Sequence, residues 1–360
     1  MKEIKLLEEN KHRPLPNPFV VGDPLKSDSE MFVGRKDIVD HIQREALKKE
    51  GGSILFIGQR RSGKTSVLKN LKRYLTSNLR TVYFDCQDPT ISGNEKYFCQ
   101  SLARSIGQEL HISKGEFVSC NSLPELTNFL KEIQHKLQQE NLRLLLCFDE
   151  YERFAEKVEK GILIDLPNAM RHWVQHLQQT IFLFAGSHFL KEIEGVDWTD
   201  YLINARLVPI SYLDFDSALK LVTNPIPDFG LVYHPNQEIA EKLVHRLGRQ
   251  PFLIQATRSE LVEYLNAKNK KEAHQEDIDI AVKRMLTSAG VYFDHIWRSD
   301  SKDIEKQIML RITYSKPLPE KSSLALRRLI KKEILCKERD RYKFCVPVFA
   351  EWIKENVDEE

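Results

Sequence analysis

The segment GQRRSGKT, residues 58–65, constrains this chain more than any other part of it. It matches the pattern G-x-x-x-x-G-K-[ST] at every fixed position, between an apolar run and an amphipathic helical pattern. In that setting the loop N–H groups and the positive end of the helix dipole converge on phosphates. Gly58 and Gly63 let the backbone turn and approach an anion, Lys64 can reach the β and γ phosphates, and Thr65 can ligate magnesium. The alternative is a strand-to-helix turn that binds nothing, and the flanking pattern disfavours it.

A second segment, RLLLCFDEYERF at 143–154, brings two carboxylates to the end of an apolar run. In a parallel sheet, ligands bind at the carboxyl ends of the strands. We expect Asp149 to hold magnesium through water and Glu150 to polarise the attacking water as general base. The alternative is a strand that ends in solvated carboxylates, and the phosphate loop upstream makes the catalytic interpretation the better one.

The run IFLFAGSH ends in Ser187 and His188 beside the same expected edge. Ser187 is a candidate sensor of the γ-phosphate or of the water, and a polar strand end in a turn is an equally good interpretation. His188 is interpreted as a loop residue rather than a catalyst.

Short apolar runs alternate with helical patterns through residues 53–210, which indicates a mostly parallel sheet with crossover helices. We predict an α/β fold of the P-loop NTPase type, with a doubly wound parallel sheet of five strands. The predicted strands are 53–57, 81–85, 144–149, 181–185 and 206–210.

The rest of the chain divides into three further segments. Residues 1–30 are charged and rich in proline, so we predict an extended segment before an α/β domain at 31–212. After about residue 213 the β runs stop, which predicts an all-helical lid at 213–298. Residues 299–360 begin with two helical patterns. The segment ILCKERDRYKFCV follows them and is expected to form two strands joined by a turn at 338–341, and the order helix, helix, strand, strand suggests a winged helix.

Composition excludes several classes of protein. Six cysteines form no CxxC pair or Cys/His cluster, which argues against zinc sites and a disulfide framework. The N-terminus has no signal-peptide pattern, and the apolar runs are too short to span a bilayer. We therefore expect a cytoplasmic protein with no membrane partner. The net charge of +2 carries no global signature of nucleic-acid binding.

Taken together, these motifs resemble a known family, the AAA+-related signal-transduction ATPases called STAND, close to the archaeal-type ATPase group and related to origin-recognition ATPases. The resemblance rests on NPFVVGDP, MFVGR, GQRRSGKTS, LCFDEYE, FLFAGSH and GRQPFLIQ, and covers nearly the whole chain. It implies ATP or ADP with Mg²⁺ as cofactors. It also implies that Val33, Gly34 and Arg35 pack against adenine and ribose, although Phe32 and Val33 alone would read as a hydrophobic staple.

The resemblance extends to the lid, where Pro251 would lie near the nucleotide. Arg249 stands where a second glycine is usual, and it is interpreted either as a sensor of the γ-phosphate or as a solvated side chain. Arg206 and Arg171 are candidate arginine fingers, but a surface arginine is the preferred interpretation of both. The remaining candidate nucleotide contacts lie in or beside the loop: Arg61, Ser62 and Ser66.

Three functions follow. The first is a slowly hydrolysing ATPase that switches conformation with its nucleotide and acts through a homo-oligomer in the ATP state or a separate effector. A role in antiviral defence rests on analogy alone. The second is a DNA-binding regulator of initiator or transposition type, because residues 321–345 hold nine Lys or Arg against three acidic residues. The third is a nucleotide-binding scaffold without turnover.

Overall fold

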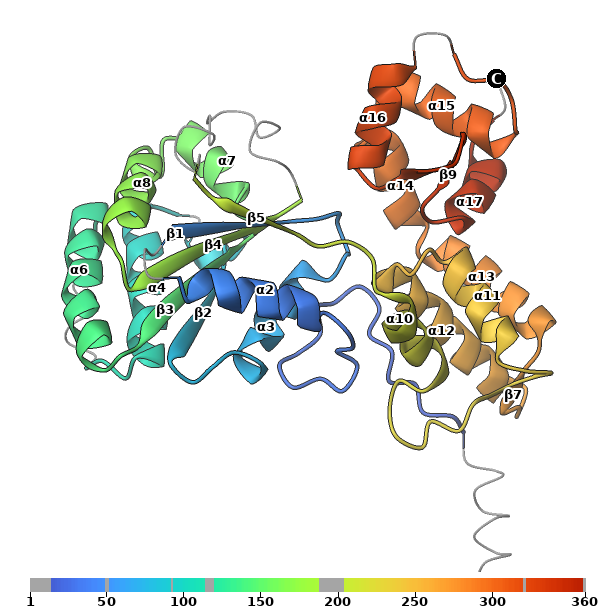
Figure 1. The fold of residues 1–360 in the computed structure, drawn as a ribbon, viewed down its shortest axis with the longest axis horizontal. Helices are drawn as coiled ribbons and strands as arrows, with labels where there is room; N and C mark the ends of the chain where they lie inside the picture. The colour runs from blue at the N-terminus through green and yellow to red at the C-terminus, as the bar shows by residue number, and fades with distance from the viewer. Residues whose placement is uncertain are drawn as a thin grey trace, which may run out of the picture. The chain divides into compact units, whose positions relative to one another are not determined.

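The computed structural model describes residues 14–48, 52–91, 93–113, 120–187, 204–319 and 322–358. The chain forms two compact units (Figure 1). The α/β unit comprises the described residues within 25–29 and 35–210. The helical unit comprises the described residues from 211 onward together with two earlier stretches, 14–24 and 30–34.

The α/β unit is built on a single five-stranded parallel sheet, which confirms the predicted fold class. The strand order is β2-β3-β4-β1-β5, and each of the five predicted strands lies within one residue or two of an observed one. The strands are β1 (Gly52–Ile57), β2 (Leu79–Asp85), β3 (Arg143–Asp149), β4 (Thr180–Gly186) and β5 (Arg206–Pro209).

The register of this sheet aligns the strand ends that carry the candidate site. Asp149 of β3 lies opposite Asp85 of β2 and Ala185 of β4, while Ile57 of β1 lies opposite Gly186 and Pro209. The phosphate loop, the acidic strand end and the Gly186-Ser187 turn therefore share one edge of the sheet.

Helices cover both faces of the sheet. Helices α4, α6 and α8 pack on one face, and α2 and α3 pack on the other (Figure 1). Successive strand residues point to opposite faces of the sheet, and both faces are covered by helices. The strands are therefore continuous apolar runs and do not alternate between apolar and polar residues. The bounds are α2 (Lys36–Ala46), α3 (Lys64–Asn70), η1 (Leu71–Arg73), η2 (Pro89–Ile91), α4 (Glu95–Glu109), α6 (Leu123–Gln139), α7 (Arg153–Glu159) and α8 (Leu166–His176).

Aromatic rings fill the core under α4, α6 and α8. Phe148 stacks on Phe184 with ring centroids 5.6 Å apart, and it contacts Phe84 and Phe154 edge to face. Trp173 of α8 is fully buried and donates its indole N–H to Thr127 of α6 at 2.8 Å. This packing holds β3 rigidly, and β3 delivers Asp149 to the site.

The helical unit contains mostly helices, with two small pairs of strands. Its elements are α10 (Phe215–Thr223), β6 (Val232–Tyr233), α11 (Glu238–Arg246), α12 (Pro251–Ala267), β7 (Glu272–Ala273), α13 (Gln275–Ser288), α14 (Gly290–Arg298), α15 (Asp303–Thr313), α16 (Ser323–Lys331), β8 (Leu335–Glu338), β9 (Arg341–Phe344) and α17 (Val348–Asn356). The predicted hairpin is confirmed, because β8 and β9 pair antiparallel across a turn at 339–340.

One sequence-based expectation for the helical unit is wrong. The β6 and β7 strands pair in parallel inside the segment that was expected to hold helices alone. Each strand is two residues long, which is too short to leave a period-2 pattern in the sequence. The predicted domain boundaries and the winged-helix assignment stay predictions. No helix in the described part of the chain is long and apolar enough to cross a bilayer.

Candidate active site

The two glycines of the phosphate loop have different physical reasons to be glycine. Gly63 precedes α3 with a φ of 96°, a left-handed conformation that glycine adopts without strain. At Gly58 a Cβ would overlap the carbonyl oxygen of Ile210, the residue after β5. From the sequence we expected both glycines to let the backbone approach an anion. At Gly58, however, the atom that leaves no room for a side chain is the backbone oxygen of Ile210, next to β5.

Lys64 lies inside the loop and is almost completely buried. Its ammonium donates to the carbonyl oxygens of Gly58 and Gln59, both at 2.8 Å. Burial lowers the Lys64 pKa, and the nearby carboxylates of Glu150, Glu152 and Asp149 oppose this. A buried ammonium at the start of a helix favours a bound phosphate.

Thr65 and Asp149 meet directly beneath the loop. The Thr65 hydroxyl donates to Oδ2 of Asp149 at 2.7 Å, and the Tyr83 hydroxyl donates to the same oxygen at 3.1 Å. Burial raises the pKa of Asp149, while the hydrogen bonds from Thr65 and Tyr83 lower it. Tyr83 was read from the sequence only as a strand residue, so its contact with Asp149 was missed.

Glu150 follows Asp149 in a left-handed backbone conformation with a φ of 53°. Such a conformation is uncommon for a residue with a side chain and concentrates at functional sites. Burial raises the Glu150 pKa, and the neighbouring Glu152 raises it further. A carboxylate with a raised pKa beside a phosphate site has the basicity that a general base requires.

Ser187 lies at the end of β4 and is held by Glu152. The Glu152 carboxylate accepts from the Ser187 backbone N–H at 2.5 Å, and the Ser187 hydroxyl lies 3.4 Å from the same oxygen. A Cβ on Gly186 would overlap this carboxylate, so the glycine makes room for it. Sequence reasoning missed Glu152, although it is the third carboxylate of DEYE. His188 lies outside the described residues.

Arg35 supports the phosphate loop from below. It is buried, has a φ of 67°, and donates to the backbone oxygen of Ser62 at 2.8 Å. Ser62 is buried within the loop, while Arg61 is exposed and left-handed, with a φ of 61°. Ser66 accepts from the backbone N–H of Leu25 at 3.0 Å. The predicted nucleotide contacts of these residues stay predictions.

The other predicted nucleotide contacts belong to the helical unit. Val33 is buried, and Gly34 has a φ of 69° with no room for a Cβ beside Ser217. Arg249 is exposed and left-handed, with a φ of 60°, a backbone conformation that favours glycine. Pro251 is the first residue of α12, and its contact with a nucleotide stays a prediction.

The two candidate arginine fingers lie in the α/β unit. Arg206 pairs with Glu45 of α2 at 2.7 Å, which accounts for its position. Arg171 is exposed on α8.

The donor set at this edge suits magnesium and a phosphate chain. Mg²⁺ prefers hard oxygen ligands and is held by one or two protein oxygens plus waters and phosphates. Thr65 and Asp149 supply a hydroxyl and a carboxylate within hydrogen-bond distance of each other, and Lys64 supplies a cation on the phosphate side. Thr65 and Asp149 would therefore hold the metal, while the loop N–H groups and Lys64 would hold the phosphates.

Comparison with known proteins agrees with this geometry. Residues 47–193 match the family model described as an AAA domain. The α/β unit has the P-loop fold of AAA+ ATPases. No curated protein matches the chain in sequence.

Solved structures resemble nearly the whole chain at low sequence identity. A Walker-type ATPase of Pyrococcus abyssi is 18% identical, with a TM-score of 0.62 over 92% of this chain and 99% of that one. The ORC2 protein of Aeropyrum pernix, solved in ADPNP and ADP complexes, is 12% identical, with a TM-score of 0.50 over 92% and 99% of the two chains. These likenesses extend the shared fold into the helical unit.

Proposed function

We propose that this protein is an ATPase that hydrolyses ATP slowly and uses the nucleotide as a conformational switch. The observation that carries the proposal is the convergence of Lys64 and Thr65 from the start of α3 with Asp149 and Glu150 from the end of β3, at one edge of the sheet. The match of residues 47–193 to the AAA domain supports nucleotide binding.

Each residue of the site has a separate role in the proposed hydrolysis. Lys64 and the loop N–H groups neutralise the charge of the phosphates, and Thr65 and Asp149 hold Mg²⁺, which offsets charge on the transferred phosphoryl group. Glu150 accepts a proton from the attacking water. Ser187, positioned by Glu152, reads the γ-phosphate or the water.

The positions of the two candidate arginine fingers, Arg206 and Arg171, support the proposal that turnover is slow. An arginine supplied to the transition state accelerates phosphoryl transfer by roughly 10³ to 10⁵. Arg206 is held in an ion pair with Glu45, and Arg171 is exposed on α8. Hydrolysis by the isolated chain should therefore be slow, and the bound nucleotide should persist as a state.

Single-turnover hydrolysis tests the catalytic assignment. Glu150→Gln should bind ATP as the wild type does but lower the hydrolysis rate by roughly 10² or more, because a positioned general base contributes about that factor. Glu140→Gln, an exposed change at the end of α6 in the same unit, is the control and should keep the wild-type rate. Equal rates in all three proteins would support a scaffold without turnover.

A switch also requires that ADP and ATP favour different arrangements of the chain. Arg249 and Pro251, at the start of α12, are the proposed residues that read the nucleotide from the helical unit. Light scattering of the full chain with ADP and with a slowly hydrolysed ATP analogue should differ in mass or shape. Identical profiles would refute the switch, and an increase in mass with the analogue would identify a homo-oligomer as the output.

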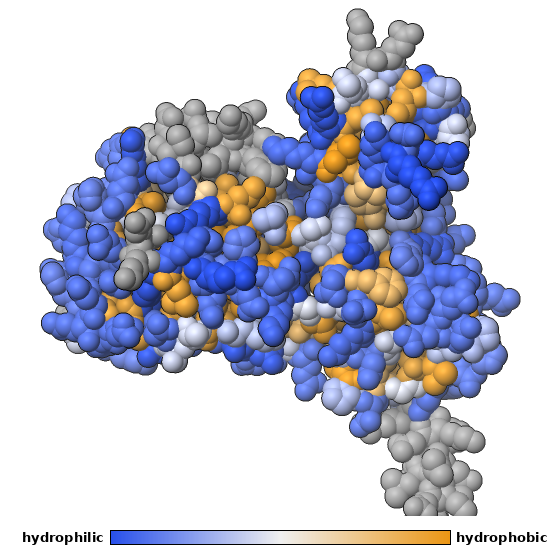
Figure 2. Space-filling model, viewed as in Figure 1, coloured by the Kyte–Doolittle hydropathy of each residue, from blue (hydrophilic) through white to orange (hydrophobic). Residues whose placement is uncertain are grey.

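A second candidate function is DNA binding by the C-terminal elements. Six basic side chains are exposed on α16 and the β8–β9 hairpin: Arg327, Lys331, Lys337, Arg339, Arg341 and Lys343. Exposed Leu324 and Ile330 lie on the same helix, and Figure 2 shows hydrophobic patches among the hydrophilic surface of this region. A mixed face of this kind also suits a protein partner, so the switch remains the first proposal.

A gel shift separates these alternatives. DNA binding should weaken as salt rises, and Arg327→Ala with Lys331→Ala should reduce it, because phosphate contacts release counterions. Lys96→Ala with Arg104→Ala, an exposed pair on α4, is a control of equal charge change. Binding that survives the α16 change would exclude this face as the DNA site.

A further inference from the structure

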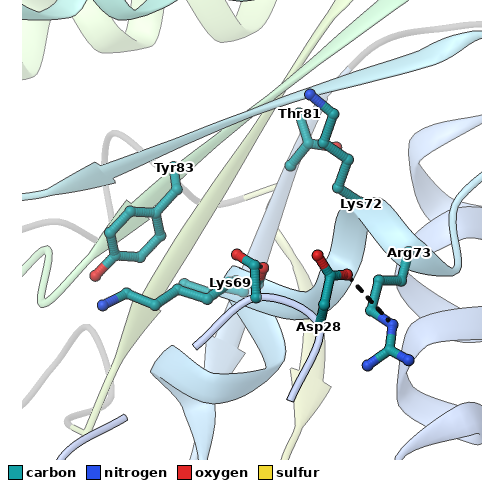
Figure 3. Close-up of a pocket in the computed structure, with 8 residues that line it drawn as sticks. Asp28, Lys69, Lys72, Arg73, Thr81 and Tyr83 are labelled. Atoms are coloured by element: carbon teal, nitrogen blue, oxygen red, sulfur yellow. Dashed lines mark hydrogen bonds and ion pairs between the residues drawn. The ribbon is translucent and has the colours of Figure 1, made fainter. Parts of the chain in front are cut away.

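A basic cavity lies beside the C-terminal half of α3, the helix that follows the phosphate loop. It has a volume of about 530 Å³ and is lined by parts of α3, η1, β2 and the segment 25–29 (Figure 3). This size is within the range of small-molecule sites. Its lining residues are Ser27, Asp28, Leu68, Lys69, Lys72, Arg73, Thr81 and Tyr83.

Cationic side chains dominate this lining. Lys69, Lys72 and Arg73 contribute three positive charges against one carboxylate, that of Asp28. Among the described residues, no carboxylate lies within ion-pair distance of Lys69, whose ammonium sits 5.3 Å from the centre of the Tyr83 ring. Figure 3 shows Lys69 extended alongside Tyr83.

The other two cations have partners that an anion can replace. Lys72 pairs with Glu109 at 2.9 Å with most of its side chain exposed, and Arg73 pairs with Asp28 at 3.5 Å. The Asp28 side chain is 78% exposed, so its pairing with Arg73 is weak.

Two residues of β2, Thr81 and Tyr83, form one wall of the cavity. Thr81 Oγ1 is shielded from solvent and has no hydrogen-bond partner among the described residues. Thr81 and Tyr83 lie two residues apart on β2 and therefore face the same side of the strand.

The cavity is connected to the candidate active site through one side chain. Tyr83 forms part of its wall, and the Tyr83 hydroxyl donates to Oδ2 of Asp149, which also accepts from Thr65. Lys69 belongs to α3, the helix that begins at Lys64. A ligand that draws Lys69 away from the Tyr83 ring would alter the surroundings of the metal-binding carboxylate.

We propose that this cavity binds a small anion carrying phosphate groups and that its occupancy changes the affinity of the active site for Mg²⁺ and nucleotide. Ammonium and guanidinium groups are the usual side chains that hold phosphate. The coupling rests on the proposed nucleotide binding at the loop, whereas anion binding in the cavity does not.

Calorimetry of the full chain tests anion binding. The phosphate loop is first filled with a slowly hydrolysed ATP analogue in excess Mg²⁺, and pyrophosphate or inorganic phosphate is then titrated. The wild type should bind pyrophosphate saturably and more tightly than phosphate. Lys69→Gln with Lys72→Gln should weaken binding roughly tenfold or more, because two charge-assisted contacts are lost. Lys96→Gln with Arg104→Gln, exposed on α4, should bind as the wild type does.

The coupling is tested by measuring Mg·ADP affinity with and without pyrophosphate. Pyrophosphate should change this affinity in the wild type, while Tyr83→Phe should still bind pyrophosphate but lose the change. The proposal is overturned if the nucleotide-loaded wild type binds no pyrophosphate, if the pocket variant binds like the α4 control, or if pyrophosphate leaves Mg·ADP affinity unchanged. Absence of heat with the ATP analogue itself would instead count against the proposed function.

Discussion

The Tyr83 hydroxyl donates to Oδ2 of Asp149 at 3.1 Å, from the strand next to the one that carries the aspartate. The same oxygen accepts the hydroxyl of Thr65 at 2.7 Å. Burial raises the Tyr83 pKa well above its usual value, and the charge of Asp149 adds to this. Tyr83 therefore stays protonated at every physiological pH and remains a hydrogen-bond donor to Asp149, the proposed metal-binding carboxylate.

Tyr83→Phe should raise the Mg²⁺ concentration needed for hydrolysis. The change removes one hydrogen bond to the charged carboxylate, worth about 1.5–3 kcal/mol, so the requirement should increase by roughly tenfold or more. The measurement is the single-turnover rate as a function of free Mg²⁺. Tyr97→Phe, an exposed change on α4, is the control, and an unchanged Mg²⁺ dependence of Tyr83→Phe would show that Asp149 needs no help from the tyrosine.

The sheet and its functional edge could be predicted because their signals are local. A run of apolar residues marks each buried strand, and GQRRSGKT fixes the turn between β1 and α3. Asp149 and Glu150 could be assigned because they directly follow such a run. The β6 and β7 strands could not be predicted, because each is only two residues long and their pairing depends on contacts between segments 40 residues apart in the chain.

Gly58→Ala should destabilise the α/β unit. A Cβ at this position overlaps the backbone oxygen of Ile210, and a backbone atom cannot move aside as a side chain can. Overpacking of this kind costs about 1–3 kcal/mol in the free energy of unfolding. Urea unfolding measures the loss, with Gly290→Ala as the control, because its Cβ would lie 3.9 Å from the nearest atom. Equal stability of the two variants would contradict the close packing of β1 against β5.

The acid limb of the pH–rate profile should reflect Glu150. The base acts when it is deprotonated, and burial raises its pKa above the ordinary 4.5, so the rate should fall as pH decreases through this raised value. Glu152→Gln removes a negative charge that also raises the Glu150 pKa, so the limb should move to lower pH. If the acid limb of the Glu152→Gln variant stays in place or moves to higher pH, the limb does not arise from Glu150 under the influence of Glu152.

Gly248→Ala should destabilise the helical unit. Gly248 has a φ of 62°, and a Cβ there overlaps the backbone of Cys345 and Val346. The combined strain should cost about 1–3 kcal/mol in the free energy of unfolding. Arg249→Gly is the matched comparison, because its left-handed φ of 60° suits glycine, and it should keep or raise stability by up to about 1 kcal/mol. A loss in Arg249→Gly as large as that in Gly248→Ala would contradict this account.

The contacts around Gly248 show what sequence reasoning could not reach. GRQP was read as a lid motif facing a nucleotide, yet Gly248 packs against the segment after β9. The neighbouring Arg246 forms two hydrogen bonds to Glu351 of α17, at 2.8 and 2.7 Å. These partners lie about 100 residues away in the chain and leave no local pattern. Tyr83 and Glu152 also leave no local pattern, because they contact Asp149 at the end of β3 and Ser187 directly after β4.

The central claim is that the loop beginning at Gly58 binds ATP through Lys64. Equilibrium binding of ATP in the presence of Mg²⁺ tests it in wild type, Lys64→Ala and Lys131→Ala, the last an exposed change on α6. The account predicts saturable binding by the wild type and by Lys131→Ala, and binding weaker by roughly 10² or more in Lys64→Ala, because a buried charge-assisted contact to phosphate is lost. Equal affinity of Lys64→Ala and the wild type would contradict it.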